Sequence, residues 1–255
     1  MFVACSTSCF SKMPLESALR KIVELEFNKV DLAIDEHSSH LRASDVADHP
    51  EAALAKLREG PSLTPSALSL DFGSNLNDAV FRRRFESICR LAKPLTVAVV
   101  TLPAAPLGSS FDDEVRRLSS LAAHALREGL VLAVTTHSET ITADPAAAVE
   151  LCKAVPGLGL SLDPSHYIQG PNHGKSYDAV FPYVRNVHFR DTGKGPGEFQ
   201  VLIGQGEIEY GRILNQLERY GYNRALTVAL RDDLDSPFDV EVEVRKLKLL
   251  LESLL

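Results

Sequence analysis

The chain alternates between short apolar runs rich in β-branched residues and longer segments with helical periodicity. Several of the short runs are apolar at successive positions, which is typical of strands that are covered on both faces. These runs predict eight strands: Phe2–Thr7, Lys29–Ile34, Ala67–Asp71, Leu95–Val100, Leu130–Thr135, Leu158–Leu162, Asn186–Arg190 and Ala225–Leu230.

The segments between the runs carry the residues that begin and end helices. Apolar side chains recur on one face of residues 112–129, and Gly129 is a suitable residue to follow the last turn. Asp144–Pro145 predicts the start of a further helix, and Ser236–Pro237 predicts the start of the last one. The stretch at 176–184 predicts only a short sixth helix.

Eight strands, each followed by a helix, predict a single-domain α/β protein, a (β/α)8 TIM barrel that covers residues 1–255. A length of 255 residues is normal for one such barrel. An open, doubly wound sheet is the alternative architecture. The first strand-to-helix turn, residues 5–14, lacks a glycine-rich phosphate-binding loop, which disfavours that alternative.

The formal net charge of −7 and the pI of about 5.6 disfavour binding to nucleic acid or to anionic membranes. The basic run Arg82–Arg84 is interpreted as a solvated helix face beside Glu86. No apolar run is long enough to predict a membrane span, and the N-terminal residues lack the charged start and apolar stretch of a secretory signal. A cytoplasmic location is therefore expected.

The four cysteines, Cys5, Cys9, Cys89 and Cys152, do not form the dense pattern of a disulfide scaffold, and no pair has the CxxC spacing. Cys5 and Cys9 are expected to be reduced, in or beside the first strand.

Histidines and carboxylates follow the ends of several predicted strands. Because the loops after the strands of a barrel form one rim, these side chains are expected to converge there. Converging polar groups at a barrel mouth cost stability unless they are used, so the joint pattern predicts a functional pocket. Histidine combined with carboxylate suits Mn²⁺, Zn²⁺ or Co²⁺. The main candidates are His37, His137, Asp163, His166, His188, Arg190 and Asp191.

Three motifs, LSLDPSHY, NVHFRDT and IGQGEIEYGRILNQLERYGYNRALTV, resemble those of the xylose isomerase-like TIM barrels. That superfamily includes sugar isomerases, ketose 3-epimerases, hydroxypyruvate isomerases, inosose dehydratases and the endonuclease IV branch. The resemblance covers most of the chain and is sharpest over Gly129–Leu230. It implies the same barrel fold and a metal site at the rim.

In that superfamily a metal is held by a Glu ending strand 5, an Asp ending strand 6, a His on strand 7 and a Glu ending strand 8. The resemblance implies that Asp163 and His188 are metal ligands. The two glutamate positions are occupied by Thr135 and Ala229. Loss of two anionic ligands is expected to weaken metal binding by several kcal/mol. It also removes the two bases that move protons in the superfamily.

The resemblance maps a substrate-contacting histidine onto His166. If the chain is a divergent enzyme, His166 and His137 would act as acid or base, because the ordinary pKa of histidine lies near neutrality. His137 or His37 would then also help Asp163 and His188 to hold a metal. Asp191 would orient His188. Arg190, His37 and Gln205 would contact the substrate.

Two functions remain open at this point. One is a divergent sugar or cyclitol isomerase or epimerase, with elimination next to a ketone as a related reaction and a weakened divalent-metal site. The other is a metal-free barrel that binds a sugar without chemistry, which Ala229 favours. Endonuclease-like DNA repair is disfavoured, because Thr135 and Ala229 cannot supply a zinc cluster and the chain is acidic. The expected partner is a small carbohydrate or cyclitol, and the superfamily also suggests a homo-oligomer.

Overall fold

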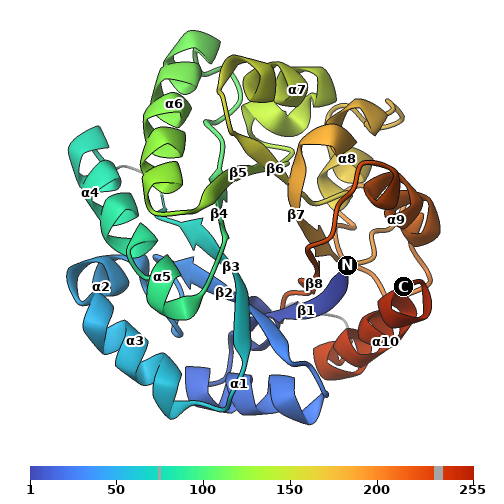
Figure 1. Cartoon of the computed structure of the whole chain (residues 1–255). Coiled ribbons are helices and arrows are strands. Elements are labelled where there is room, and N and C mark those ends of the chain that lie inside the picture. The colour runs from blue at the N-terminus through green and yellow to red at the C-terminus, as the bar shows by residue number, and fades with distance from the viewer. Residues whose placement is uncertain (74–75, 233–237) are drawn as a thin grey trace.

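The computed structural model describes residues 1–73, 76–232 and 238–255. Eight parallel strands form a closed barrel in chain order, and helices surround it (Figure 1). The barrel closes where β1 pairs with β8, with Phe2 opposite Ala225. This confirms the predicted single-domain (β/α)8 TIM barrel. The strands are β1 (Phe2–Ser6), β2 (Lys29–Asp35), β3 (Thr64–Asp71), β4 (Val99–Pro103), β5 (Val131–Thr135), β6 (Gly159–Leu162), β7 (Val184–Phe189) and β8 (Ala225–Val228).

The helices lie outside the barrel and connect successive strands. A 3-10 helix with an internal proline, η3, replaces the expected short sixth helix. The α-helices are α1 (Leu15–Glu24), α2 (Ala43–Asp48), α3 (Pro50–Glu59), α4 (Asp78–Cys89), α5 (Ala92–Leu95), α6 (Phe111–Arg127), α7 (Pro145–Ala154), α8 (Ser165–Gln169), α9 (Tyr210–Arg219) and α10 (Val240–Ser253). The 3-10 helices are η1 (Thr7–Phe10), η2 (Ile141–Ala143) and η3 (Asp178–Tyr183).

The helix boundaries follow local chemistry. The side chain of Asp144 accepts a hydrogen bond from the backbone N–H of Ala146 at 2.9 Å and so caps α7, as predicted. Gly129 follows α6 with a φ of 80°, the left-handed conformation that glycine adopts without strain. The predicted start of the last helix at 236–237 lies outside the described residues. Within them, α10 begins after Asp239, which caps it.

The predicted fourth strand, Leu95–Val100, was wrong at its start. Leu95 ends α5, and Thr96 turns the chain with a φ of 56°. The strand itself is Val99–Pro103. The apolar run could not distinguish the two, because short apolar segments suit a buried helix turn as well as a strand.

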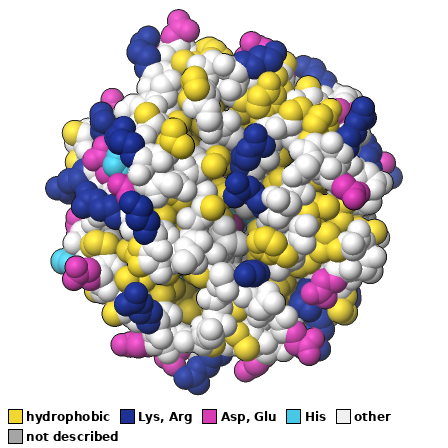
Figure 2. All heavy atoms as spheres, in the orientation of Figure 1, with side chains coloured by type: hydrophobic (Ala, Val, Ile, Leu, Met, Phe, Trp, Pro, Cys, Tyr) yellow, Lys and Arg dark blue, Asp and Glu magenta, His cyan; other side chains and the backbone are white. Residues whose placement is uncertain are grey.

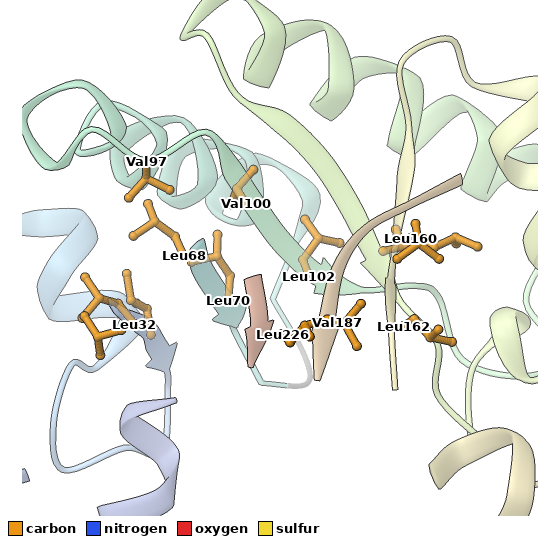
Figure 3. Packing of buried hydrophobic residues seen from close by; sticks show 14 of the residues in the cluster. Leu32, Leu68, Leu70, Val97, Val100, Leu102, Leu160, Leu162, Val187 and Leu226 are labelled. Atoms are coloured by element: carbon orange, nitrogen blue, oxygen red, sulfur yellow. The ribbon is translucent and has the colours of Figure 1, made fainter. Parts of the chain in front are cut away.

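Alternate residues of each strand pack outward against the helices. Because side chains alternate along a strand, the residues between them face the barrel interior. Figure 3 shows the outward set, with large aliphatic side chains packed together. This set includes Leu32, Leu68, Leu70, Val100, Leu102, Leu160, Leu162, Val187 and Leu226.

The interior set is mostly small or polar. Its buried polar members are Asp31, Thr101, Ser161, Asn186 and Thr227. Ala67, Val99 and Ala133 form a small apolar cluster of their own, separate from the core between strands and helices. The strands therefore alternate between large apolar residues outside and mostly small or polar residues inside.

The surface departs from one expectation about the basic run. Arg82 pairs with Glu86 at 2.9 Å and is exposed, as predicted. Arg84 is instead largely covered and pairs with Glu36, in the loop after β2, at 3.2 Å.

On the face that Figure 2 shows, basic and acidic side chains are interspersed around the circumference, and basic ones stand beside the central hollow.

Two pockets lie where the strands begin, away from the rim. Their volumes are about 400 and 220 Å³, and both are lined by Thr64, Pro65 and Thr96.

No described helix combines the length and apolar character that a membrane span requires. All four cysteines are free and buried.

Candidate functional site

The carboxyl ends of β5, β6 and β7 bring together most of the predicted site residues. Asp163 directly follows β6, and Arg190 directly follows β7. His188 and Arg190 share the interior face of β7, because they lie two positions apart on the strand. His166 lies in α8, and His137 lies in the loop after β5.

Arg190 lies at the centre of this group. Its Nη2 donates hydrogen bonds to Oδ2 of Asp163 at 2.7 Å and to Nε2 of His166 at 3.0 Å. Its Nε donates to Oγ of Ser165 at 3.0 Å. Within the described chain, Nη1 has no hydrogen-bond partner. We call Asp163, Ser165, His166 and Arg190 the Arg190 cluster.

Both carboxylate oxygens of Asp163 are engaged inside the cluster. While Oδ2 accepts from Arg190, Oδ1 accepts from the backbone N–H of Ser165 at 3.0 Å and from its hydroxyl. Burial alone would raise the pKa of Asp163, but the charge of Arg190 and the bond from Ser165 lower that pKa to about 2. Asp163 is therefore ionised near neutral pH, with Arg190 as its counter-charge.

His166 is held as a neutral ring. Its Nδ1 lies 3.1 Å from the hydroxyl oxygen and 3.3 Å from the backbone nitrogen of Ser138, and its Nε2 accepts from Arg190. Burial is the main cause that lowers the pKa of His166 to about 4; Arg190 acts in the same direction and Asp163 opposes it. Because both nitrogens are engaged, Nε2 can accept a proton only after Arg190 turns away.

His137 stands beside His166, with 4.0 Å between the ring centroids. Its Nδ1 accepts a hydrogen bond from the backbone N–H of Glu139 at 3.2 Å. A neutral ring that accepts at Nδ1 carries its proton on Nε2. Burial lowers the pKa of His137, which favours this neutral form. His137 can therefore donate a hydrogen bond to a ligand oxygen.

His188 is bound to a residue that sequence reasoning did not identify. Its Nε2 lies 2.8 Å from Oδ2 of Asp31, which reaches across the interior from β2 and is fully buried. Burial would lower the pKa of His188, but the charge of Asp31 and the hydrogen bond raise it. Asp31 was missed because a single acid in the middle of a strand carries no strand-end signal.

Asp191 does not orient His188, contrary to our expectation. Its Oδ2 accepts from the backbone N–H groups of Gly204 at 2.7 Å and Gly206 at 3.1 Å. Its Oδ1 accepts from the N–H of Thr192 at 3.0 Å. The glycine-containing motif is thus a turn wound around the carboxylate of Asp191.

His37 and Gln205 are not brought into contact with the Arg190 cluster. His37 is exposed, and a Cβ on Gly73, in the loop after β3, would lie 3.3 Å from its Nε2. Gln205 is exposed as well, and its backbone N–H donates to the carbonyl of Leu202 at 3.0 Å. Both residues lie at outer positions of the described rim.

The segment between β7 and α9 covers the cluster. The ring of Phe199 lies 5.2 Å from that of His166. The amide of the next residue, Gln200, makes two hydrogen bonds to the backbone of Arg231, at 2.7 and 2.8 Å. These bonds fasten the segment to the residues that follow β8. Only 9% of the His166 side chain and 11% of the Arg190 side chain are exposed.

The residues at this rim do not fit a divalent metal. Asp163 is the remaining carboxylate of the expected ligand set, and a guanidinium that would repel a second cation is already bound to it. His188 alone has the carboxylate-supported form of a metal-binding histidine. Across residues 1–73, 76–232 and 238–255, no three His, Cys, Asp or Glu side chains form a group that could hold a metal ion.

Sequence comparison decides the family. The profile of the xylose isomerase-like TIM barrel family matches residues 19–250. The chain belongs to this family. A search of curated proteins finds no significant match.

Solved structures of this fold carry varied activities. The probable 3-DHS dehydratase AsbF of Bacillus anthracis is 16% identical, with a TM-score of 0.73 and 99% of both chains covered. The 3-keto-D-glucoside 4-epimerase YcjR of E. coli is 14% identical, with a TM-score of 0.72 and 99% of both chains covered. A xylose isomerase-like protein of Mycobacterium smegmatis, solved with magnesium, is 18% identical, with a TM-score of 0.72 and coverage of 99% of this chain and 97% of that one. At these identities the likeness shows the shared fold.

Proposed function

We propose that this chain is a divergent isomerase- or epimerase-like enzyme that acts on a small carbohydrate or cyclitol with a carbonyl group. The observation that carries the proposal is the convergence of Arg190, His166, His137 and His188 on the rim that follows β5 to β7. Convergent polar groups at the carboxyl end of a barrel are the usual form of an active site in this fold.

The proposed reaction breaks a C–H bond next to the carbonyl. The electron pair of that bond moves toward the carbonyl oxygen, which gains negative charge. Nη1 of Arg190 and Nε2 of His137 would donate hydrogen bonds to this oxygen and stabilise the charge. The absent glutamates are not needed for this step.

The proton would pass to Nε2 of His166. When the substrate oxygen draws Arg190 toward itself, His166 loses its hydrogen bond and Nε2 becomes a free base. Return of the proton to the former carbonyl carbon, with transfer of the hydroxyl proton of the first carbon to the former carbonyl oxygen, gives isomerisation. Return of a proton to the opposite face of the same carbon gives epimerisation. In the related elimination, a hydroxyl group on the next carbon leaves as water with the proton that His166 has taken.

His188 supplies the second imidazole of the site, oriented by Asp31. In the proposed reaction it would serve as a second acid or base. His37 and Gln205 lie farther out, where they would contact the hydroxyl groups of a ligand that extends beyond the cluster.

The test is proton exchange at carbon. Keto sugars, inososes and 3-keto glycosides are incubated with the protein in deuterated water and followed by NMR. We expect deuterium to enter next to the carbonyl of at least one compound, with a loss of about 100-fold in His166→Gln. His49→Gln, at an exposed histidine outside the rim, should exchange at the parent rate. Absence of exchange in every compound would overturn the proposal.

A second candidate is a barrel that binds a carbohydrate without chemistry. Ala229 favours it, because alanine cannot transfer a proton, and so does the engagement of both Asp163 and His166 by Arg190. Under this candidate at least one compound of the panel would shift NMR signals of the protein, but no compound would exchange its C–H protons for deuterium.

A further inference from the structure

The guanidinium of Arg190 is largely buried and is held by several hydrogen bonds. Three of its N–H groups bind Asp163, Ser165 and His166 at distances of 2.7 to 3.0 Å. Only 11% of the side chain is exposed. A guanidinium held by several partners is positioned within the site before a ligand arrives.

The charges at the rim are balanced without a metal. The ligand set expected from the family places three carboxylates around a divalent ion, whereas one guanidinium is balanced by one carboxylate. Thr135 and Ala229 leave Asp163 as the remaining member of the expected carboxylates, and Asp163 is bound by Arg190. The two glutamates that would balance a divalent ion are absent, and the single carboxylate that remains is balanced by the single positive charge of Arg190.

The bonds of Arg190 leave one nitrogen for a ligand. Nη1 makes no hydrogen bond within the described residues, although Nε and Nη2 are both engaged. It is also absent from the buried side-chain atoms that lack a partner, so solvent reaches it. Nη1 is therefore the nitrogen of the guanidinium that remains available to a ligand oxygen.

We propose that the guanidinium of Arg190 replaces the divalent metal beside Asp163, excludes that metal from the site, and grips ligand oxygens through Nη1. The identity of those oxygens rests on the proposed function, but the exclusion of metal does not. The site is thus metal-independent and carries its own cation.

The experiment is a Mn²⁺ titration of chelator-treated protein, with free Mn²⁺ followed by electron paramagnetic resonance. The parent protein should bind no Mn²⁺ at this site, so that the signal of free Mn²⁺ stays the same when the protein is added. Arg190→Met removes the charge and keeps the length of the stem, so it should bind Mn²⁺ at least about tenfold more tightly. Adding Asp163→Asn to that variant should abolish the gain.

Two further variants keep the test decisive if Arg190→Met folds poorly. Arg190→Lys retains a cation and should exclude Mn²⁺ as the parent does. Arg190→Gln retains hydrogen-bond donors without charge and should gain Mn²⁺ binding. One Mn²⁺ bound per parent chain and lost in Asp163→Asn would overturn the proposal, and so would an unchanged affinity in both neutral variants.

This titration contains no carbohydrate, so its result is independent of the deuterium-exchange test. If Mn²⁺ is excluded as expected and no compound exchanges, the proposed reaction fails while the role of Arg190 as cation stands. If exchange occurs, it should continue at the parent rate in the presence of chelator. Exchange that stops with chelator and returns with Mn²⁺ would contradict metal independence.

Discussion

His188 and Asp31 are hydrogen-bonded at 2.8 Å across the barrel interior, from β7 to β2. The two residues lie far apart in the sequence and on strands that do not pair with each other. Asp31 is fully buried, and its second oxygen, Oδ1, has no partner among the described residues. The interior below the rim therefore holds a buried charge that is compensated mainly from one side.

Breaking this pair should destabilise the fold. In Asp31→Asn, His188 loses its counter-charge in a buried setting, which costs about 3–5 kcal/mol of unfolding free energy. His188→Gln leaves the Asp31 carboxylate without its partner and should cost a similar amount. Urea unfolding of both single variants and the double variant measures the coupling. Additive losses, with no coupling beyond about 0.5 kcal/mol, would show that the bond contributes nothing.

The turn around Asp191 gives a prediction about two glycines. A Cβ on Gly206 would lie 2.1 Å from Oδ1 of Asp191 and 2.6 Å from the N of Thr192, so Gly206→Ala should destabilise the protein by more than about 1 kcal/mol, as at other overpacked sites. A Cβ on Gly211, in α9, would meet only open space, and Gly211→Ala should stabilise by up to about 1 kcal/mol. Thermal unfolding of the two variants should shift in opposite directions. An unchanged or raised unfolding temperature in Gly206→Ala would contradict the close approach.

The repeat of strands and helices could be predicted from the sequence because each strand carries large apolar residues on the face toward the helices. Leu160 and Leu162, for example, alternate with Ser161, which faces inward. The start of β4 could not be predicted, because Leu95 belongs to an apolar run that continues into the strand but lies in a helix. Local composition does not determine where such a run changes its backbone conformation.

The site could be predicted in part. Asp163, His166 and Arg190 were found because they lie at or just beyond strand ends, and His188 because the motif NVHFRDT resembles that of the xylose isomerase-like barrels. The hydrogen bonds among these side chains could not be predicted in this way, because the position of a residue on a strand does not determine where a long side chain points.

Asp31 was missed for a related reason. It faces inward from the middle of β2, and only the closed barrel brings it to His188. The sequence thus predicted which residues gather at the rim, whereas their pairing depends on the three-dimensional arrangement.

His40 should make the stability depend on pH. It is buried, and its Nε2 donates to the carbonyl of Met13 at 2.7 Å. Burial lowers its pKa in the folded protein, so the unfolded chain binds more protons below the ordinary pKa of about 6.5. Unfolding free energy should therefore fall as the pH drops from about 6.5 toward the folded value. His40→Gln, which keeps a donor, should show a smaller fall in urea unfolding between these limits; an equal fall would contradict the assignment.

Phe199 should control access to His166. Its ring covers the imidazole at 5.2 Å between centroids, so Phe199→Ala should speed modification of His166 by diethyl pyrocarbonate several-fold. Peptide mapping by mass spectrometry identifies the modified residue. Phe111→Ala, at an exposed phenylalanine at the start of α6, is the matched control and should leave the rate unchanged. Equal rates in all three proteins would show that the segment does not shield the site.

The most direct measurement is a crystal structure of the protein grown with Mn²⁺, with anomalous data collected for the metal. We predict guanidinium density joined to the carboxylate of Asp163 and no anomalous peak beside it. An anomalous peak bound to Asp163 and His188, with Arg190 turned away, would contradict the central claim that this barrel carries its own cation.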